Sequence, residues 1–197
     1  MTTPPSSSST TESAAQAGSG ARKYSGTAMA LHWLIALLII GGFALGWVMT
    51  DIPGFTPAKL KYFSWHKWIG VTALVLIIIR LAYRATHTPP ALPAGMGRLS
   101  AVAAHGVHHF LYLLMVCVPL SGYLYSSIAG IQVVYLGLVP LPTLVGPHPE
   151  LRHLFRNIHV YLDWTLFAVV ILHFLAVLKH QLLDRDRLLS RMLPFGD

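Results

Sequence analysis

Residues 28–49 constrain this chain more than any other segment, because they contain no Asp, Glu, Lys or Arg. A helix needs about 20 mainly apolar residues to cross the hydrocarbon core of a bilayer. A soluble protein would have to bury such a helix on every side. We therefore expect residues 28–49 to form a transmembrane helix.

Three further segments have the same character, at 64–83, 101–127 and 158–178. The segment at 64–83 reaches this length only if Lys67 and Arg80, near its ends, extend their charged groups to the two membrane surfaces. The segment at 101–127 contains Pro119 and Gly122 and should be kinked, which membrane helices tolerate. The segment at 158–178 carries one acidic residue, Asp163. The sequence thus predicts an all-α protein, a four-helix bundle integral to the membrane.

The composition agrees with a membrane protein, since hydrophobic residues make up 54% and charged residues 11% of the 197. Soluble domains carry roughly 25% charged residues. This composition excludes a disordered chain and a nucleic-acid binder, and it argues against a soluble enzyme. The exception is residues 1–21, rich in Ser, Thr and Pro, which we expect to be a disordered cytoplasmic tail preceding a membrane domain at 22–197.

The basic residues predict the orientation, because they are commoner on the cytoplasmic side of membrane proteins. With four spans, both termini lie on one side, which would hold Arg22, Lys23, Arg80, Arg84, Arg98, Lys179, Arg185, Arg187 and Arg191. The other side would hold Lys59, Lys61, Lys67, Arg152 and Arg156. We therefore expect both termini to be cytoplasmic. Residues 128–156, interrupted by Pro and Gly, should form a loop on the opposite membrane surface, with room for a short interfacial helix.

Four histidines inside the spans are the candidate functional residues, since ionisable groups are costly in a membrane. His159 and His173 are 14 positions apart in the sequence, so they share a helix face at depths about 21 Å apart. His32 falls at the depth of His173, and His66 at the depth of His159. The spacing predicts two cross-bundle pairs. Opposed imidazoles of this kind suit the two axial positions of a haem iron.

Other cofactors fit the four histidines less well. Zinc takes three or four protein ligands, whereas each depth supplies two. A di-iron site needs several carboxylates, and the spans offer Asp163 alone. The remaining alternative is that each histidine makes a helix–helix hydrogen bond.

Several motifs around these histidines occur together in the bacterial cytochrome b561 family. They are ALHWLIALL around His32, SWHKWIG around His66, NIHVYLDW around His159 and ILHFLAVLKHQLLDRDRLLSRM around His173. The chain resembles this family over residues 24–194. The resemblance implies a four-helix protein of the bacterial inner membrane with two haem b groups, whose iron ligands are His32, His66, His159 and His173. It also implies electron transfer linked to quinone, since some relatives oxidise superoxide and reduce ubiquinone.

Four further residues are candidates for supporting roles. His105 and His108 lie on one face of a helix and are candidates to pass protons to ubiquinone, with an ordinary interfacial role as the alternative. Arg80 and Lys67 are candidates to pair with haem propionates, and extension of their charges to the membrane surface is the alternative.

The function expected is transmembrane electron transfer, from superoxide on the outer side to ubiquinone on the inner side. Iron held by two histidines has no open position for oxygen, which favours outer-sphere transfer. One alternative is a haem-bearing membrane anchor that passes electrons for a partner dehydrogenase or periplasmic redox protein. The other is a membrane protein without redox activity, in which the histidines are structural.

Overall fold

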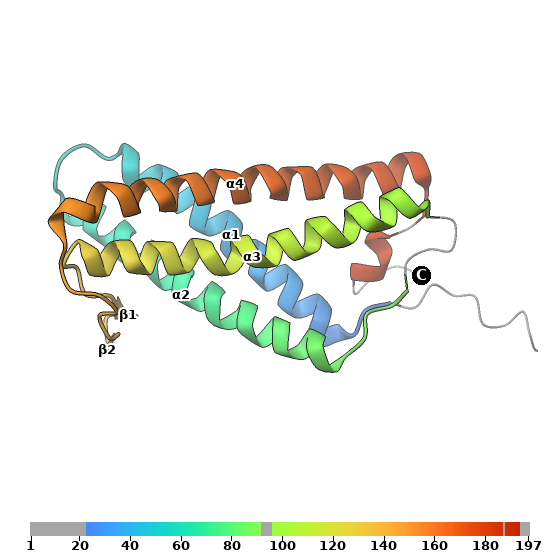
Figure 1. Cartoon of the computed structure of the whole chain (residues 1–197), viewed down its shortest axis with the longest axis horizontal. Coiled ribbons are helices and arrows are strands. Elements are labelled where there is room, and N and C mark those ends of the chain that lie inside the picture. Colours follow the sequence, from blue (N-terminus) through green and yellow to red (C-terminus); the bar gives the residue numbers. More distant parts are fainter. Residues whose placement is uncertain (1–22, 92–95, 187, 194–197) are drawn as a thin grey trace, which may run out of the picture.

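Four long helices make up the computed structural model, which describes residues 23–91, 96–186 and 188–193 (Figure 1). They are α1 (Gly26–Asp51), α2 (Pro57–Thr86), α3 (Arg98–Ile128) and α4 (Arg152–Lys179). All four are long and apolar enough to cross a membrane. The predicted tail at 1–21 lies outside the described residues.

The helices begin where the sequence supplies capping groups. Ser25 precedes α1 and accepts a hydrogen bond from the Ala28 amide, and Thr56 does the same for Lys59 at the start of α2. Pro57 follows Thr56, at a position where a helix needs no amide donor. The helix α2 therefore begins seven residues before the span predicted at 64, within the polar flank.

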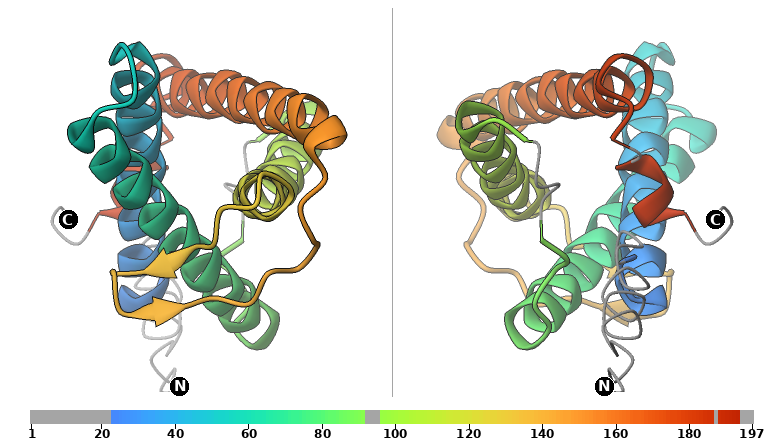
Figure 2. Two further views of the ribbon diagram at one scale, coloured as in Figure 1. Left: turned by 90° about the vertical axis from the view of Figure 1, so that its left-hand side faces the viewer. Right: turned by 90° about the vertical axis from the view of Figure 1, so that its right-hand side faces the viewer.

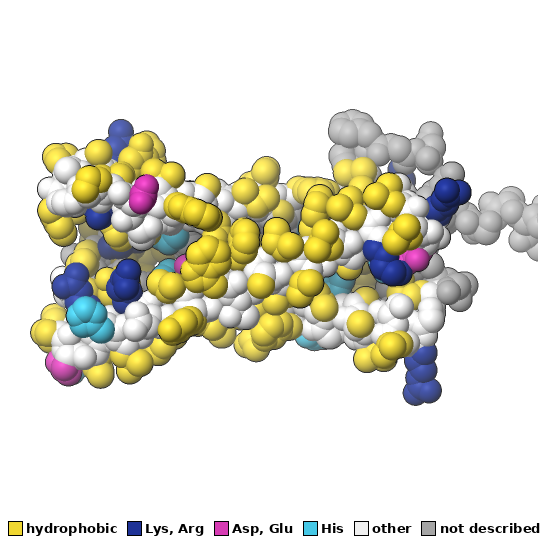
Figure 3. All heavy atoms as spheres, turned by 90° about the horizontal axis from the view of Figure 1, so that it is seen from above, with side chains coloured by type: hydrophobic (Ala, Val, Ile, Leu, Met, Phe, Trp, Pro, Cys, Tyr) yellow, Lys and Arg dark blue, Asp and Glu magenta, His cyan; other side chains and the backbone are white. Residues whose placement is uncertain are grey.

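The bundle consists of two antiparallel helix pairs, α1 with α2 and α3 with α4. Ile35, Ala73 and Ile77 form a buried cluster between α1 and α2. Leu111, Leu114 and Leu166 form a second cluster between α3 and α4. Many large apolar side chains on all four helices are exposed. Figure 3 shows apolar side chains over the middle of one face and Lys and Arg near its two ends, as expected for a bundle surrounded by lipid.

The two ends of the bundle differ, and we name them by their histidines. At the His32 end, α1 and α3 begin and α2 and α4 end. At the His66 end, α1 and α3 end and α2 and α4 begin.

The connection from α3 to α4 contains a β hairpin rather than the interfacial helix that the sequence allowed. Strand β1 (Val134–Tyr135) pairs antiparallel with β2 (Val139–Pro140), beside α2 at the His66 end (Figure 2). Left-handed backbone at Leu136 and Gly137 makes the turn, which a helix cannot accommodate. Within the described part of this loop, the helical element is the short turn η1 (Pro149–Leu151), which leads directly into α4.

After α4 the chain turns back and packs against the His32 end of the bundle. A π-helical turn, η2 (His180–Asp184), is followed by the short helix η3 (Leu189–Met192). The Trp33 indole donates to the Met192 carbonyl at 2.8 Å, and Arg191 donates to the Ala91 carbonyl at 2.9 Å. These bonds tie α1 and the loop after α2 to the end of the chain.

Candidate functional site

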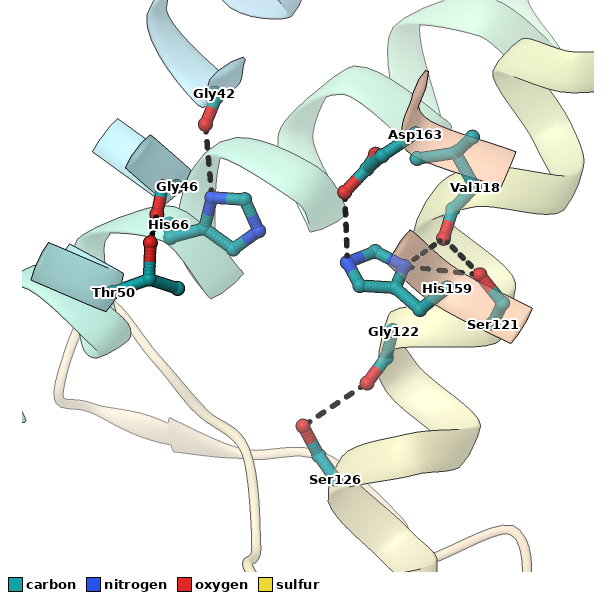
Figure 4. Close-up of polar contacts among 10 residues, drawn as sticks. All are labelled: Gly42, Gly46, Thr50, His66, Val118, Ser121, Gly122, Ser126, His159 and Asp163. Atoms are coloured by element: carbon teal, nitrogen blue, oxygen red, sulfur yellow. Dashed lines mark hydrogen bonds and ion pairs between the residues drawn. The ribbon is translucent and has the colours of Figure 1, made fainter. Parts of the chain in front are cut away.

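His66 on α2 and His159 on α4 face each other at the His66 end, with ring centroids 6.2 Å apart (Figure 4). Nδ1 of His66 donates to the Gly42 carbonyl at 3.0 Å. Nδ1 of His159 lies 3.1 Å from the Val118 carbonyl and 3.0 Å from Ser121 Oγ. Both Nδ1 atoms thus point to the backbone of a neighbouring helix, α1 for His66 and α3 for His159.

These hydrogen bonds leave Nε2 of each ring as the nitrogen available to bind a metal. A backbone carbonyl that accepts from one ring nitrogen fixes the ring and raises the basicity of the other nitrogen. Histidines that bind metals almost always have such a partner. Each histidine of this pair therefore has the backbone hydrogen bond that is typical of a metal-binding histidine.

Two glycines make room for these rings. A Cβ atom at Gly122 would lie 2.9 Å from Cε1 of His159, closer than side chains tolerate. A Cβ atom at Gly46 would lie 3.4 Å from Cε1 of His66. The lack of a side chain at position 122 is thus a condition for the observed position of His159.

Two charged residues adjoin this pair. Lys67 and Asp163 line the same largely apolar cavity as His66 and His159. Oδ2 of Asp163 lies 3.4 Å from Nε2 of His159. The carboxylate is thus next to the nitrogen that would bind a metal, so it contributes negative charge at that position.

His32 on α1 and His173 on α4 form the second pair, with ring centroids 6.4 Å apart. His108 on α3 adds a third imidazole, whose centroid is 5.3 Å from that of His173. Both candidates on α3, His105 and His108, are exposed, and it is His108 whose ring contacts this pair. The structure therefore brings the four predicted histidines together as two pairs, one at each end of the bundle.

Arg80 lies near the His32 pair but is held by its own hydrogen bonds. Its Nη1 donates to the Ala28 carbonyl at 2.8 Å, and its Nε donates to the Tyr112 hydroxyl at 3.0 Å. These bonds connect α2 to α1 and α3. The guanidinium thus has a structural role between three helices.

An apolar layer separates the two histidine pairs. Phe43 on α1 contacts Phe167 on α4, with ring centroids 5.2 Å apart. Phe43 also packs against the cluster of Leu111, Leu114 and Leu166. Phe167 falls between His159 and His173 on α4, so this layer lies between the two pairs along the bundle.

The spacing of the rings in both pairs fits iron held between two imidazoles. A histidine nitrogen binds a metal ion such as zinc at about 2 Å, so two opposed imidazoles sharing one metal have ring centres roughly 6 Å apart. The observed 6.2 and 6.4 Å match this value. Among the described residues, three metal-binding side chains come together at His180, Asp184 and Asp186, beyond the end of α4, and not at either pair.

Comparison with known proteins decides the family. A family model described as prokaryotic cytochrome b561 matches residues 23–195. The chain belongs to the prokaryotic cytochrome b561 family. Membership implies a membrane protein that binds b-type haem and transfers electrons.

Several relatives are similar to this chain over most of their length. Cytochrome b561 homolog 2 of Escherichia coli (strain K12) is 29% identical over 171 residues, which cover 87% of this chain and 91% of the relative. The probable superoxide oxidase CybB of Yersinia pestis is 30% identical over 178 residues, covering 88% and 97%. Cytochrome b561 homolog 1 of E. coli is 26% identical over 176 residues, covering 87% and 97%.

Sequence reasoning missed several groups at the His66 pair. The carbonyls of Gly42 and Val118 leave no signal in the sequence, since every residue has one. The sequence predicts only that Gly122 kinks its helix, although the structure places His159 directly against it. The spacing of Gly42 and Gly46, one helical turn apart, does indicate a close approach on one face of α1.

Proposed function

We propose that this cytochrome b561 relative holds two b haems, one between His32 and His173 and one between His66 and His159. The observation that carries the proposal is the facing of two imidazoles at each end of the bundle, with centroids 6.4 and 6.2 Å apart. When bound, haem b supplies reversible one-electron oxidation and reduction.

We further propose that the protein oxidises superoxide and reduces ubiquinone. Two superoxide ions give up one electron each and become oxygen, and ubiquinone takes up two electrons and two protons to become ubiquinol. Support comes from the relative named as a probable superoxide oxidase, at 30% identity. The four membrane-spanning helices and the histidine pairs at both ends also favour electron transfer across the bilayer.

The His66 end has a charge that favours an anionic substrate. Its basic residues are Lys59, Lys61, Lys67, Arg152 and Arg156, and its acidic residues are Asp51, Glu150 and Asp163. Lys67 lines the cavity that also holds His66 and His159. A positive surface raises the encounter rate with an anion such as superoxide. In this proposal Lys67 attracts the anion and can also pair with a haem propionate.

The His32 end is the proposed place of ubiquinone reduction. The ring of His108 lies against that of His173 there, and the other candidate, His105, lies one turn earlier on the exposed surface of α3. Nδ1 of His108 is bonded to the Ala104 carbonyl at 2.6 Å, which leaves Nε2 for a hydrogen bond to the quinone. We assign this role to His108, with His105 exchanging protons with water. In this proposal Arg80 keeps its bonds to Ala28 and Tyr112 and also pairs with a haem propionate.

The proposed membrane is the bacterial inner membrane, with the His32 end and both termini on the cytoplasmic side. The excess of Lys and Arg in the flanks at that end supports this orientation. The His66 end would then face the periplasm, where it meets superoxide arising outside the cytoplasm.

The test is turnover by the purified chain alone. Superoxide is generated in the presence of ubiquinone-1, and the formation of ubiquinol is followed at its absorbance change. We expect ubiquinol in a ratio of one to two superoxide ions consumed, with much less product when superoxide dismutase is added first. Protein that carries its haems but forms no ubiquinol would contradict this substrate pair and favour a membrane anchor serving a partner enzyme.

A further inference from the structure

The two histidine pairs differ in what orients their rings. At the His66 end, backbone carbonyls bond to both rings, as described above. At the His32 end, no described residue forms a hydrogen bond with the ring of His32 or of His173. The χ2 angle of a histidine is a soft torsion, so a ring without a hydrogen bond must be held by its packing. His32 therefore needs a neighbour that fixes its ring by contact.

Trp33 is that neighbour. Its indole meets the imidazole of His32 edge to face, with ring centroids 5.3 Å apart and planes at 75°. Aromatic rings favour this arrangement. On its other side His32 faces His173, at 6.4 Å. The position of the indole thus limits the angles that the His32 ring can adopt.

The indole is itself held by the end of the chain. Its Nε1 donates to the Met192 carbonyl at 2.8 Å. Met192 is the last residue of η3, which lies beside α1 (Figure 2). The Tyr24 amide donates to the Arg191 carbonyl at 3.1 Å, and Nη1 of Arg191 donates to the Ala91 carbonyl at 2.9 Å. The short helix is thus fixed to the residues before α1, to α1 itself and to the loop after α2.

A group of contacts at the end of α4 turns the chain back toward α1. The backbone at Arg185 is left-handed, with φ at 54°, a conformation uncommon for residues other than glycine. Nδ1 of His180 lies 2.7 Å from Oδ2 of Asp186 and 3.0 Å from Oδ2 of Asp184. Oδ1 of Asp186 also accepts from the Leu188 amide, immediately before η3, at 3.3 Å. The contacts of His180 and Asp186 therefore hold the reversal that leads into η3.

We propose that Trp33 and His180 are positioning residues for His32. His180 holds the reversal after α4, the reversal brings η3 to α1, and the Met192 carbonyl fixes the indole that packs on His32. The end of the chain thereby sets the angle between His32 and His173, whose planes lie at 68°. This role rests on the proposed function, since the angle matters when both imidazoles bind one iron.

The test uses the purified full-length protein with its haem. Trp33→Phe removes the indole donor and keeps an aromatic ring beside His32. The EPR spectrum of a low-spin haem reports the angle between its two axial imidazoles, and steeply crossed rings give the larger g values. We expect the signal of the haem at the His32 end to broaden and move to lower g, with the other signal unchanged. The signal that remains in His66→Ala identifies the haem at the His32 end.

Hydrogen exchange measures the same contact independently of haem. In Trp33→Phe, exchange at residues 188–193 should be about five-fold faster, the factor for loss of one hydrogen bond. Trp47→Phe is the matched control, because it makes the same substitution in α1, at an indole that is 69% exposed and contacts Trp164 instead of η3. Trp47→Phe should leave the exchange at 188–193 and both EPR signals unchanged.

Variants of His180 test the contacts from the other end. His180→Ala removes the bonds to Asp184 and Asp186 and should shift the same EPR signal in the same direction as Trp33→Phe. His180→Asn keeps a side-chain donor near that position and should retain the original signal. The double variant Trp33→Phe/His180→Ala should shift the signal no further than the larger single change, since both residues act through one contact.

Several results would overturn the proposal. An unchanged EPR signal in Trp33→Phe would show that η3 does not position His32, and an equal shift in Trp47→Phe would mean a general packing effect. Additive shifts in the double variant would mean that Trp33 and His180 act separately. If Trp33→Phe failed to fold, the original signal in His180→Ala would overturn the proposal by itself. Unaltered protein without haem would instead contradict the proposed function, while the exchange at 188–193 would still show whether Trp33 holds η3.

Discussion

At the scale of single residues, His66 is the position where the proposed ligation can be separated from a structural role. In His66→Ala the pair at that end loses one imidazole, while the His32 pair on the other side of the Phe43–Phe167 layer stays intact. We expect the haem content per chain to fall by half, measured by the pyridine haemochrome. His109→Ala is the control, since that ring is exposed and bonded to its own helix. Equal haem in both variants would contradict the assignment.

Gly122 tests the space around His159 rather than the ligand itself. Gly122→Ala puts a methyl group 2.9 Å from Cε1 of His159, so the ring must move out of line with His66. We expect this variant to lose the haem at the His66 end, although alanine is the better helix former by about 1 kcal/mol.

Gly106→Ala is the matched control for this change. It makes the same substitution in the same helix, where nothing lies within 4 Å of the added Cβ. It should keep its full haem content. If Gly122→Ala also retained both haems with an unaltered spectrum, the close approach of His159 to α3 would have no part in cofactor binding.

The charge of Asp163 should affect the haem at the His66 end. Its carboxylate lies 3.4 Å from Nε2 of His159, and a nearby negative charge stabilises oxidised iron. In Asp163→Asn we expect the midpoint potential of the haem at the His66 end to rise, by at most on the order of 100 mV. The potential of the other haem should shift by less. Potentiometric titration of the visible spectrum measures both. A fall, or equal shifts of both potentials, would contradict this placement of the carboxylate.

At the scale of elements, the β hairpin between α3 and α4 is held to α2 by two side chains. The Trp68 indole donates to the Val134 carbonyl at 2.7 Å, and the hydroxyls of Thr72 and Tyr135 lie 2.8 Å apart. Trp68→Phe removes the first bond, at a cost of about 1 kcal/mol. We expect faster hydrogen exchange at residues 131–141, measured by mass spectrometry.

Trp65→Phe is the control for this prediction. Trp65 lies one turn earlier on α2 and contacts Tyr62 and Lys61 instead of the hairpin. In Trp65→Phe, hydrogen exchange at residues 131–141 should equal that of the unchanged protein. Equal acceleration in both variants would mean that loss of any indole near this end loosens the loop.

The elements also show why sequence predicts the helices better than the loop. Apolar length is a property of the segment itself, so residues 28–49 predict a helix without knowledge of its neighbours. The β hairpin has only two residues in each strand, and it depends on contacts with Trp68 and Thr72, which are distant in the sequence. The return of η3 to Trp33 likewise joins residues 159 positions apart.

At the scale of the whole molecule, the arrangement of the four histidines follows from helix geometry. Fourteen residues of helix bring His173 back to the face of His159, so one helix, α4, supplies a ligand candidate at each end. The partners come from α1 and α2, and the antiparallel order of the helices sets each partner at the matching depth. The pairing of the histidines can thus be predicted from the sequence, whereas the glycine and carbonyl groups that orient each ring depend on how the helices pack.

Two b haems held by the two histidine pairs are the basis of the proposed function, and a redox titration of the purified full-length protein is its sharpest test. Haem is quantified per chain, and the reduced-minus-oxidised spectrum is followed as the potential is varied. We expect two low-spin b haems per chain that titrate in two steps, because among the described residues a carboxylate lies beside a ligand candidate at the His66 end alone. A single haem would show that one pair is structural, and protein without haem after expression with ample haem supply would overturn the assignment of both pairs.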